Sequence, residues 1–123
     1  MKIYLIRHGQ TTGDVNGLYG GTFDDYLSQK GINQVKKLAP KLKGRAIEII
    51  YSSPYLRAKE TADILAKTLK IPIEIKDDLR ERNVYGFMSG KSKKEMKAKH
   101  PNQVEILQDY RQAIHDAEEY EDF

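Results

Sequence analysis

Hydrophobic positions predict an alternation of strands and helices along the first 75 residues. Residues 2–6 are a short run of β-branched and aromatic side chains without helical spacing, which predicts a buried strand. Residues 46–51 and 71–75 have the same character. Between these runs, apolar residues recur three and four positions apart over residues 28–44 and 54–69, which predicts two amphipathic helices.

This order of elements predicts the fold class. Strands that alternate with helices favour a parallel sheet with helices on its faces, the α/β class. A length of 123 residues is typical of one domain, so we expect a single domain over residues 1–123. Ser28 and Ser53 are suited to capping the two helices, and Pro40 predicts a kink or an early end in the first.

The rest of the chain predicts two loops and two further helices. Residues 9–27 and 77–90 are rich in turn-forming residues, and loops of this length usually carry function. Ser92 and Glu95 form a capping box for a short helix that ends at Lys99. Pro101 then begins a longer helix that we expect to run toward the chain end. Its apolar side is Val104, Leu107, Tyr110, Ala113, Ile114 and Ala117.

The end of the chain is unusual for a complete domain. The last predicted helix has no glycine cap, and its final residues, 118–122, carry four acidic side chains at the negative end of the helix dipole. Three short strands also make a thin sheet. We therefore expect a C-terminally incomplete fold, whose exposed sheet edge would favour a homo-oligomer.

Composition narrows the classes of function. The sequence is 39% hydrophobic and 32% charged, and it has no apolar run near the roughly 18 residues of a membrane span. We expect a cytoplasmic protein that binds no membrane, because the start is also too short for a secretory signal. A net charge of +3 is too small to indicate a nucleic-acid binder, and the lysines of residues 91–99 are typical of a solvated helix face. The absence of cysteine excludes disulfides, thiolate metal sites and a cysteine nucleophile.

Candidate chemistry lies where the predicted strands end. Ligands of open α/β sheets bind beyond the carboxyl ends of the strands. Arg7 and His8 follow the first strand, and Arg57 falls in the first turn of the helix after the second strand. Guanidinium groups and a helix N-terminus bind phosphate oxygens, and an imidazole can act as a nucleophile. The alternative for Arg57 is a surface residue paired with Glu60.

A carboxyl group follows the third predicted strand. Glu81 could donate a proton to a leaving oxygen if the site raised its pKa. Its neighbours Arg80 and Arg82 would instead lower that pKa, so the alternative is a surface ion-pair cluster.

Three motifs, in this order, resemble those of the histidine phosphatase superfamily, also called the phosphoglycerate mutase-like family. The resemblance covers residues 1–100. The motifs are Arg7-His8-Gly9-Gln10-Thr11, then Ser52-Ser53-Pro54 with Arg57-Ala58 and Thr61-Ala62, then Leu79 with Glu81 and Gly86.

The resemblance implies a mechanism and a set of site residues. His8 would attack phosphorus and become a phosphohistidine, Arg7 and Arg57 would hold the phosphoryl oxygens, and Glu81 would act as general acid and then base. Neither a metal nor another cofactor is implied, and the partner would be a small phosphorylated substrate. The residues that would line the substrate pocket are Thr11, Asp14 and Gly21.

Three features depart from the family pattern, the first being the spacing of Glu81 and Gly86, which is one residue longer than expected. Asp14 stands where the family usually has asparagine. The family's second catalytic histidine lies in a later His-Gly pair, which neither His100 nor His115 matches. Despite these departures, the resemblance implies a phosphomonoester phosphatase. The alternatives are a phosphoglycerate mutase and a phosphate-binding or interaction module without turnover.

Overall fold

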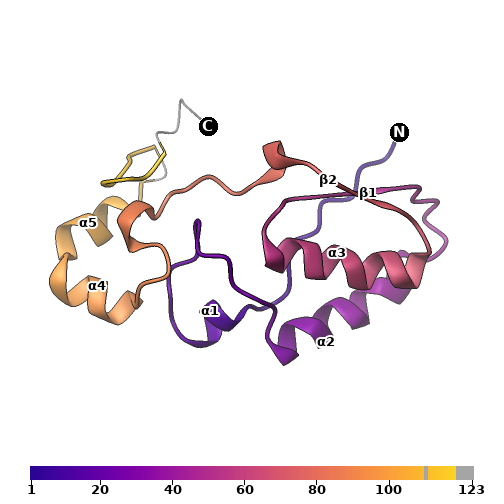
Figure 1. Cartoon of the computed structure of the whole chain (residues 1–123), viewed down its shortest axis with the longest axis horizontal. Coiled ribbons are helices and arrows are strands. Elements are labelled where there is room, and N and C mark those ends of the chain that lie inside the picture. Colours follow the sequence, from indigo (N-terminus) through magenta and orange to yellow (C-terminus); the bar gives the residue numbers. More distant parts are fainter. Residues whose placement is uncertain (110, 119–123) are drawn as a thin grey trace. The chain divides into compact units, whose positions relative to one another are not determined.

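The structure, a computed structural model, describes residues 1–109 and 111–118 (Figure 1). The chain forms two compact units, each treated by itself below. The first comprises residues 1–11 and 26–80, and the second comprises residues 12–25 and the chain from residue 81 onward. None of the helices in the described part is both long and apolar enough to cross a membrane.

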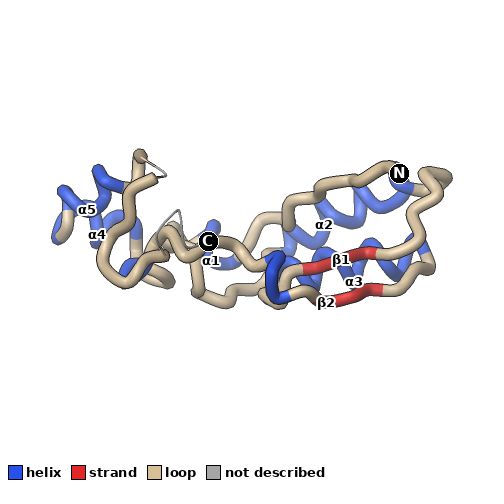
Figure 2. The backbone as a smooth tube through the Cα atoms, turned by 90° about the horizontal axis from the view of Figure 1, so that it is seen from above, coloured by secondary structure: helices blue, strands red, loops and turns tan. Residues whose placement is uncertain are grey.

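The first unit is a small parallel sheet covered by helices (Figure 2). Strands β1 and β2 run parallel, with Ile50 opposite Ile73 and Ser52 opposite Ile75. Helix α3 connects the two strands and packs on them, and α2 packs on α3 (Figure 1). The α/β class predicted from the sequence is confirmed. The elements are α2 (Gln29–Leu38), the 3-10 helix η1 (Ala39–Leu42), β1 (Ile50–Ser52), α3 (Leu56–Leu69), β2 (Ile73–Ile75) and the 3-10 helix η2 (Asp77–Leu79).

The predicted helices of this unit form because local signals and the core agree. Ser28 caps α2, accepting a hydrogen bond from the Gly31 N–H at 3.1 Å. The helix narrows into η1 at Pro40, as the proline predicts. Helix α3 begins at Leu56, two residues later than predicted, and Tyr55 occupies its cap position. The apolar sides of these helices meet in one core, whose buried members are Leu27, Val35, Ala39, Leu42 and Leu65.

The first strand prediction is wrong, and the other two strands are shorter than predicted. Residues 2–6 do not form a strand, and Ile3 and Leu5 are 72% and 95% exposed. The run has the composition of a strand, but a strand also requires a neighbour to accept its backbone hydrogen bonds. The second predicted strand is shorter, because its pairing begins where the Ile50 N–H donates to the carbonyl of Pro72.

The second unit is built from short helices and turns. Its buried core consists of Tyr19, Met88, Met96 and Ile114. Ser92 caps α4 by accepting a hydrogen bond from the Glu95 N–H, and the helix ends at Lys99 as predicted. The helices are α1 (Thr12–Val15), the 3-10 helix η3 (Gly86–Met88), α4 (Lys93–Lys99) and α5 (Pro101–Ile106).

The long last helix predicted from the sequence is wrong. Helix α5 ends at Ile106, and residues 111–118 form turns and irregular backbone. The Asp109 carboxylate accepts hydrogen bonds from the Arg111 N–H at 3.1 Å and from the Gln112 side chain at 3.0 Å. Such local bonds compete with a continuing helix. Ile114 is nevertheless buried in the core, whereas Tyr110 and residues 119–123 lie outside the described part.

Candidate functional site

In the first unit, residues 7–11, called the His8 segment below, lie directly on the start of α2. A Cβ atom built on Gly9 would come within 2.5 Å of the Gly31 carbonyl oxygen, so two glycines allow this approach. The Ser28 N–H donates to the Gln10 carbonyl at 2.8 Å, and the Ser28 hydroxyl lies 2.8 Å from the Gln10 side-chain oxygen. These contacts fix the residues that follow His8.

The hydrogen bond of His8 determines which ring nitrogen carries the proton. Its Nδ1 lies 2.8 Å from the Gly9 carbonyl oxygen. A carbonyl oxygen only accepts, so Nδ1 is the donor, and Nε2 of the neutral ring then carries a lone pair. The side chain is half-buried. His8 is therefore suited to attack an electrophile through Nε2.

Arg57 lies where the sequence places it, in the first turn of α3 beyond the end of β1. Only 4% of the residue is exposed, which contradicts the alternative of a surface arginine. Its guanidinium stacks on the Tyr55 ring, 4.7 Å from the centroid. A buried guanidinium at a helix N-terminus is well suited to bind an anion.

The other predicted residues of this unit lie on the His8 segment. Thr11 is 2% exposed and forms an antiparallel bridge with Leu27, whereas Arg7 is exposed. The Leu27 N–H donates to the Glu60 carboxylate at 2.7 Å. Glu60 lies in α3, one turn after Arg57. Hydrogen bonds thus link the His8 segment to the helix that carries Arg57.

The second unit contains the remaining predicted residues. Asp14 is exposed in α1, whose Gly13 N–H donates to the buried Asp25 carboxylate at 3.1 Å. Gly21 is buried with a φ of +65°, and a Cβ atom there would lie 2.6 Å from the Ser89 hydroxyl oxygen. Glu81 is exposed.

The segment after Glu81 is organised by Asn83. The Asn83 side-chain oxygen accepts from the Gly86 N–H at 3.0 Å, and its amide group donates to the Asp116 carbonyl at 3.1 Å. The Asn83 N–H donates to the Glu118 carboxylate at 2.9 Å. Asparagine three residues before glycine is a local turn signal that could have been recognised in the sequence.

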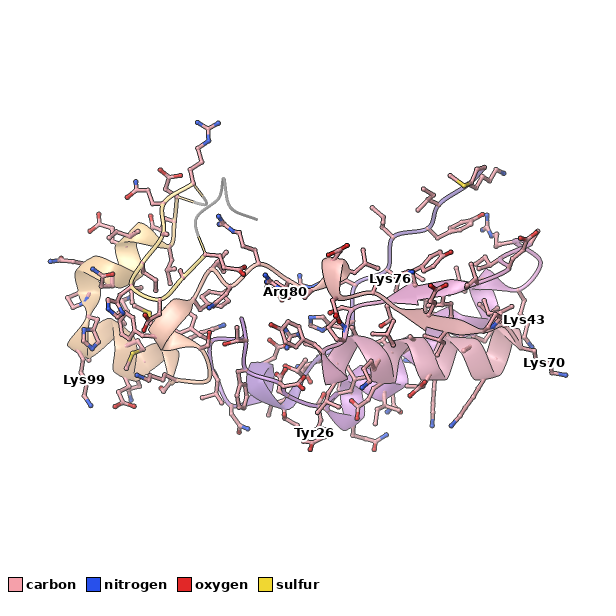
Figure 3. The ribbon with its side chains drawn as sticks, turned by 45° about the horizontal axis from the view of Figure 1, so that its top comes forward. Tyr26, Lys43, Lys70, Lys76, Arg80 and Lys99 are labelled. Atoms are coloured by element: carbon pink, nitrogen blue, oxygen red, sulfur yellow. The ribbon has the colours of Figure 1, made fainter. Side chains whose placement is uncertain are left out.

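A cavity of about 450 Å³ lies at the opposite end of α3 from Arg57. It is lined by the end of η1, the residues that follow it and residues 68–70, and its lining includes Lys43 and Lys70, which are labelled in Figure 3. The cavity is therefore separate from the residues that the sequence predicts to bind phosphate.

Comparison with known proteins supports the resemblance carried by these residues. The profile of the histidine phosphatase superfamily (branch 1) matches residues 3–123. The chain belongs to this superfamily. A probable phosphatase of Schizosaccharomyces pombe is 39% identical over 107 residues, which are 83% of this chain and 51% of that protein. The metal-independent phosphoserine phosphatase of Arabidopsis thaliana is 39% identical over 103 residues, 81% of this chain and 42% of its own.

Solved structures of similar proteins agree with this assignment. A mycobacterial glucosyl-3-phosphoglycerate phosphatase superposes with a TM-score of 0.82 at 29% identity, covering 94% of this chain and 55% of its own. The chain thus spans about half the length of the histidine phosphatases that it matches. The activities in the names of these relatives belong to proteins about twice as long as this chain.

The sequence of this superfamily member contains two further histidines, far from His8 along the chain. His100 follows α4 and packs edge-on against Phe87, with ring centroids 5.2 Å apart. His115 is exposed, with Nδ1 3.0 Å from the Asp116 carboxylate. Both side chains are exposed, and neither lies in a helix, because His100 stands between α4 and α5 and His115 lies in a turn. The lysines around α4 are likewise exposed.

Proposed function

We propose that this histidine phosphatase superfamily member is a metal-independent phosphomonoester phosphatase that acts through a phosphohistidine on His8. The observation that carries the proposal is the hydrogen bond from His8 Nδ1 to the Gly9 carbonyl, which leaves Nε2 with its lone pair. The buried Arg57 supports it, because a phosphoryl dianion needs cationic partners in the transition state.

The first chemical step transfers the phosphoryl group to the protein. His8 Nε2 attacks phosphorus, the N–P bond forms and the bond from phosphorus to the substrate oxygen breaks. Arg57 and Arg7 bind the phosphoryl oxygens and offset their charge. The leaving oxygen takes a proton from the carboxyl group of Glu81, so that the product is a neutral alcohol.

The second step regenerates the histidine. A water molecule attacks phosphorus while the Glu81 carboxylate takes its proton, the N–P bond breaks and inorganic phosphate leaves. Glu81 therefore acts first as acid and then as base. Its role rests on the family resemblance, and its exposed carboxyl group is open to exchange of protons with water.

The substrate class is a small phosphomonoester of an alcohol. Relatives include the phosphoserine phosphatase of Arabidopsis thaliana. Another relative is an adenosylcobalamin/alpha-ribazole phosphatase of Escherichia coli. Thr11, Asp14 and Gly21 are the residues that we propose to line its pocket. Asp14 contributes an acceptor rather than an amide donor, which favours substrates that present a hydroxyl or amino group there.

Release of inorganic phosphate from an aryl phosphate, measured with a chelator present, tests the proposal. The wild type should release phosphate, and His8→Ala should lower the rate by more than about 1,000-fold, as loss of a nucleophile does. His115→Ala is the matched control, because its exposed ring should be dispensable. Binding of vanadate without phosphate release would instead support a binding module.

A further inference from the structure

We infer that Gln34 is a positioning residue for His8, acting through the peptide group that joins Gly9 to Gln10. The effect of Gln34 on the reaction rests on the proposed function. Its effect on the proton of the His8 ring does not depend on turnover. Gln34 lies in α2, 26 positions after His8 in the sequence.

One peptide group makes both of the hydrogen bonds concerned. Its carbonyl, from Gly9, accepts the proton of His8 Nδ1 at 2.8 Å. Its N–H, from Gln10, donates to the Gln34 side-chain oxygen at 2.9 Å. The peptide bonds among the described residues are all trans.

Peptide planarity couples these two bonds. In a trans peptide, the C=O and the N–H lie in one rigid plane and point in opposite directions. A hydrogen bond that holds the N–H therefore also sets the direction of the carbonyl. Gln34 thus orients the acceptor that keeps the proton on His8 Nδ1.

Neighbouring contacts hold other parts of the same segment. Ser28 donates hydrogen bonds to the backbone carbonyl and to the side-chain oxygen of Gln10. Neither of these oxygens is part of the peptide group that joins Gly9 to Gln10. The Gln34 bond acts on the plane itself. At this exposed position a water molecule could accept from the Gln10 N–H in place of Gln34, but unlike the Gln34 side chain it is not anchored to α2.

The consequence for His8 is a choice between two neutral forms. When the Gly9 carbonyl faces the ring, the proton stays on Nδ1 and Nε2 is nucleophilic. When the plane tilts away, Nδ1 loses its acceptor and the proton can move to Nε2, which removes the lone pair that the reaction needs. Gln34 therefore favours the reactive form without touching the substrate.

The direct test is nitrogen-15 NMR of the His8 ring in the full chain, which reports the proton on each ring nitrogen. The wild type should show the Nδ1–H form at a pH where the ring is neutral. Gln34→Leu removes the acceptor and should produce a mixture with the Nε2–H form. Gln34→Glu keeps an acceptor at the same length and should restore the wild-type spectrum. Asn33→Leu is the matched control on α2, because the Asn33 side-chain oxygen accepts a hydrogen bond from the exposed Gln29 side chain at 3.2 Å and not from the Gly9–Gln10 peptide.

The kinetic test measures formation of the phosphoenzyme from an aryl phosphate. Gln34→Leu should slow it by about 10- to 100-fold, the range known for losing the outer hydrogen-bond partner of a metal-bound histidine. Gln34→Glu and Asn33→Leu should stay near the wild-type rate, with unchanged melting temperatures for all three variants.

The two tests separate the inference from the proposed function. An unchanged His8 ring spectrum in a folded Gln34→Leu variant would overturn the inference, whatever the activity. A shifted ring spectrum supports it even if the wild type forms no phosphoenzyme, and in that case the proposed function alone would fail.

Discussion

Leu27 and Glu60 connect two segments that carry the candidate site of the first unit. The Leu27 N–H donates to the Glu60 carboxylate at 2.7 Å, and Leu27 is 5% exposed. Leu27 also bridges to Thr11, three residues after His8. Because Glu60 lies one turn after Arg57, this bond sets the position of α3 relative to the His8 segment.

Glu60→Ala should therefore destabilise the fold. The variant leaves a part-buried backbone N–H without its acceptor, which costs up to about 1–3 kcal/mol. Glu60→Gln keeps an acceptor oxygen and should lose less than half as much. Urea unfolding of the two variants checks this, and equal stabilities for Glu60→Ala and the wild type would show that the bond is replaced by water.

Gly31→Ala should disturb the His8 segment. In an ordinary helix interior the change would stabilise the protein by up to about 1 kcal/mol. Here the added Cβ would overlap the Gln10 carbonyl and lie 2.8 Å from the Gln10 nitrogen, and backbone cannot rotate away as a side chain can. We expect a net loss of about 1–3 kcal/mol from overpacking.

Thermal unfolding of Gly31→Ala beside Gly20→Ala measures this loss. Gly20 has open space where a Cβ would stand, so its variant should unfold at the wild-type temperature. A Gly31→Ala protein as stable as Gly20→Ala, with phosphate release intact, would contradict the close approach described above.

Arg57→Lys should lower phosphate release by about 100- to 1,000-fold, the range for losing one transition-state donor. Lysine keeps the positive charge but not the planar pair of donors that matches two phosphoryl oxygens. Arg45→Lys is the control, because Arg45 is exposed. If both variants keep full activity and vanadate affinity, Arg57 does not bind the phosphoryl group.

Lys99 should control the titration of Glu95 in α4. Its ammonium donates to the Glu95 carboxylate at 2.6 Å and lowers the pKa of Glu95 below the ordinary value of 4.5. A lowered pKa in the folded state means that the pair stabilises the helix above pH 4.5 and that this contribution is lost as pH falls through the folded pKa.

Lys99→Met should accordingly raise the pKa of Glu95 toward 4.5, as followed by carbon-13 NMR of its carboxyl group. Lys97→Met serves as the control on the same helix and should leave the titration unchanged. An unaltered Glu95 titration in Lys99→Met would show that the pair does not persist in solution.

Local sequence signals predicted the helices better than the strands. Helices α2 and α3 satisfy their own backbone bonds, so apolar spacing and the Ser28 cap were sufficient to place them. A strand at residues 2–6 requires a neighbouring strand, which hydrophobicity alone does not supply. The last helix failed because Asp109 makes a turn that competes with the apolar spacing of the residues after it.

The candidate residues of the first unit came from combined motifs rather than from single positions. A lone arginine–histidine pair in a loop is usually solvated, so His8 gained weight only beside Arg57 in the first turn of the helix after β1. Gln34 was not recognised, because an exposed glutamine on a helix has no distinctive spacing. Its importance depends on how closely α2 approaches Gly9, a tertiary feature that the two glycines permit.

The most direct test of the account is to trap the phosphohistidine. The full chain would be mixed briefly with an aryl phosphate in chelator, denatured and weighed intact before and after acid treatment, beside His8→Ala and His115→Ala. We predict an acid-labile phosphoryl adduct on the wild type and on His115→Ala, and none on His8→Ala. An adduct that persists in His8→Ala, or a folded wild type that binds vanadate yet forms no adduct, would contradict His8 as the nucleophile.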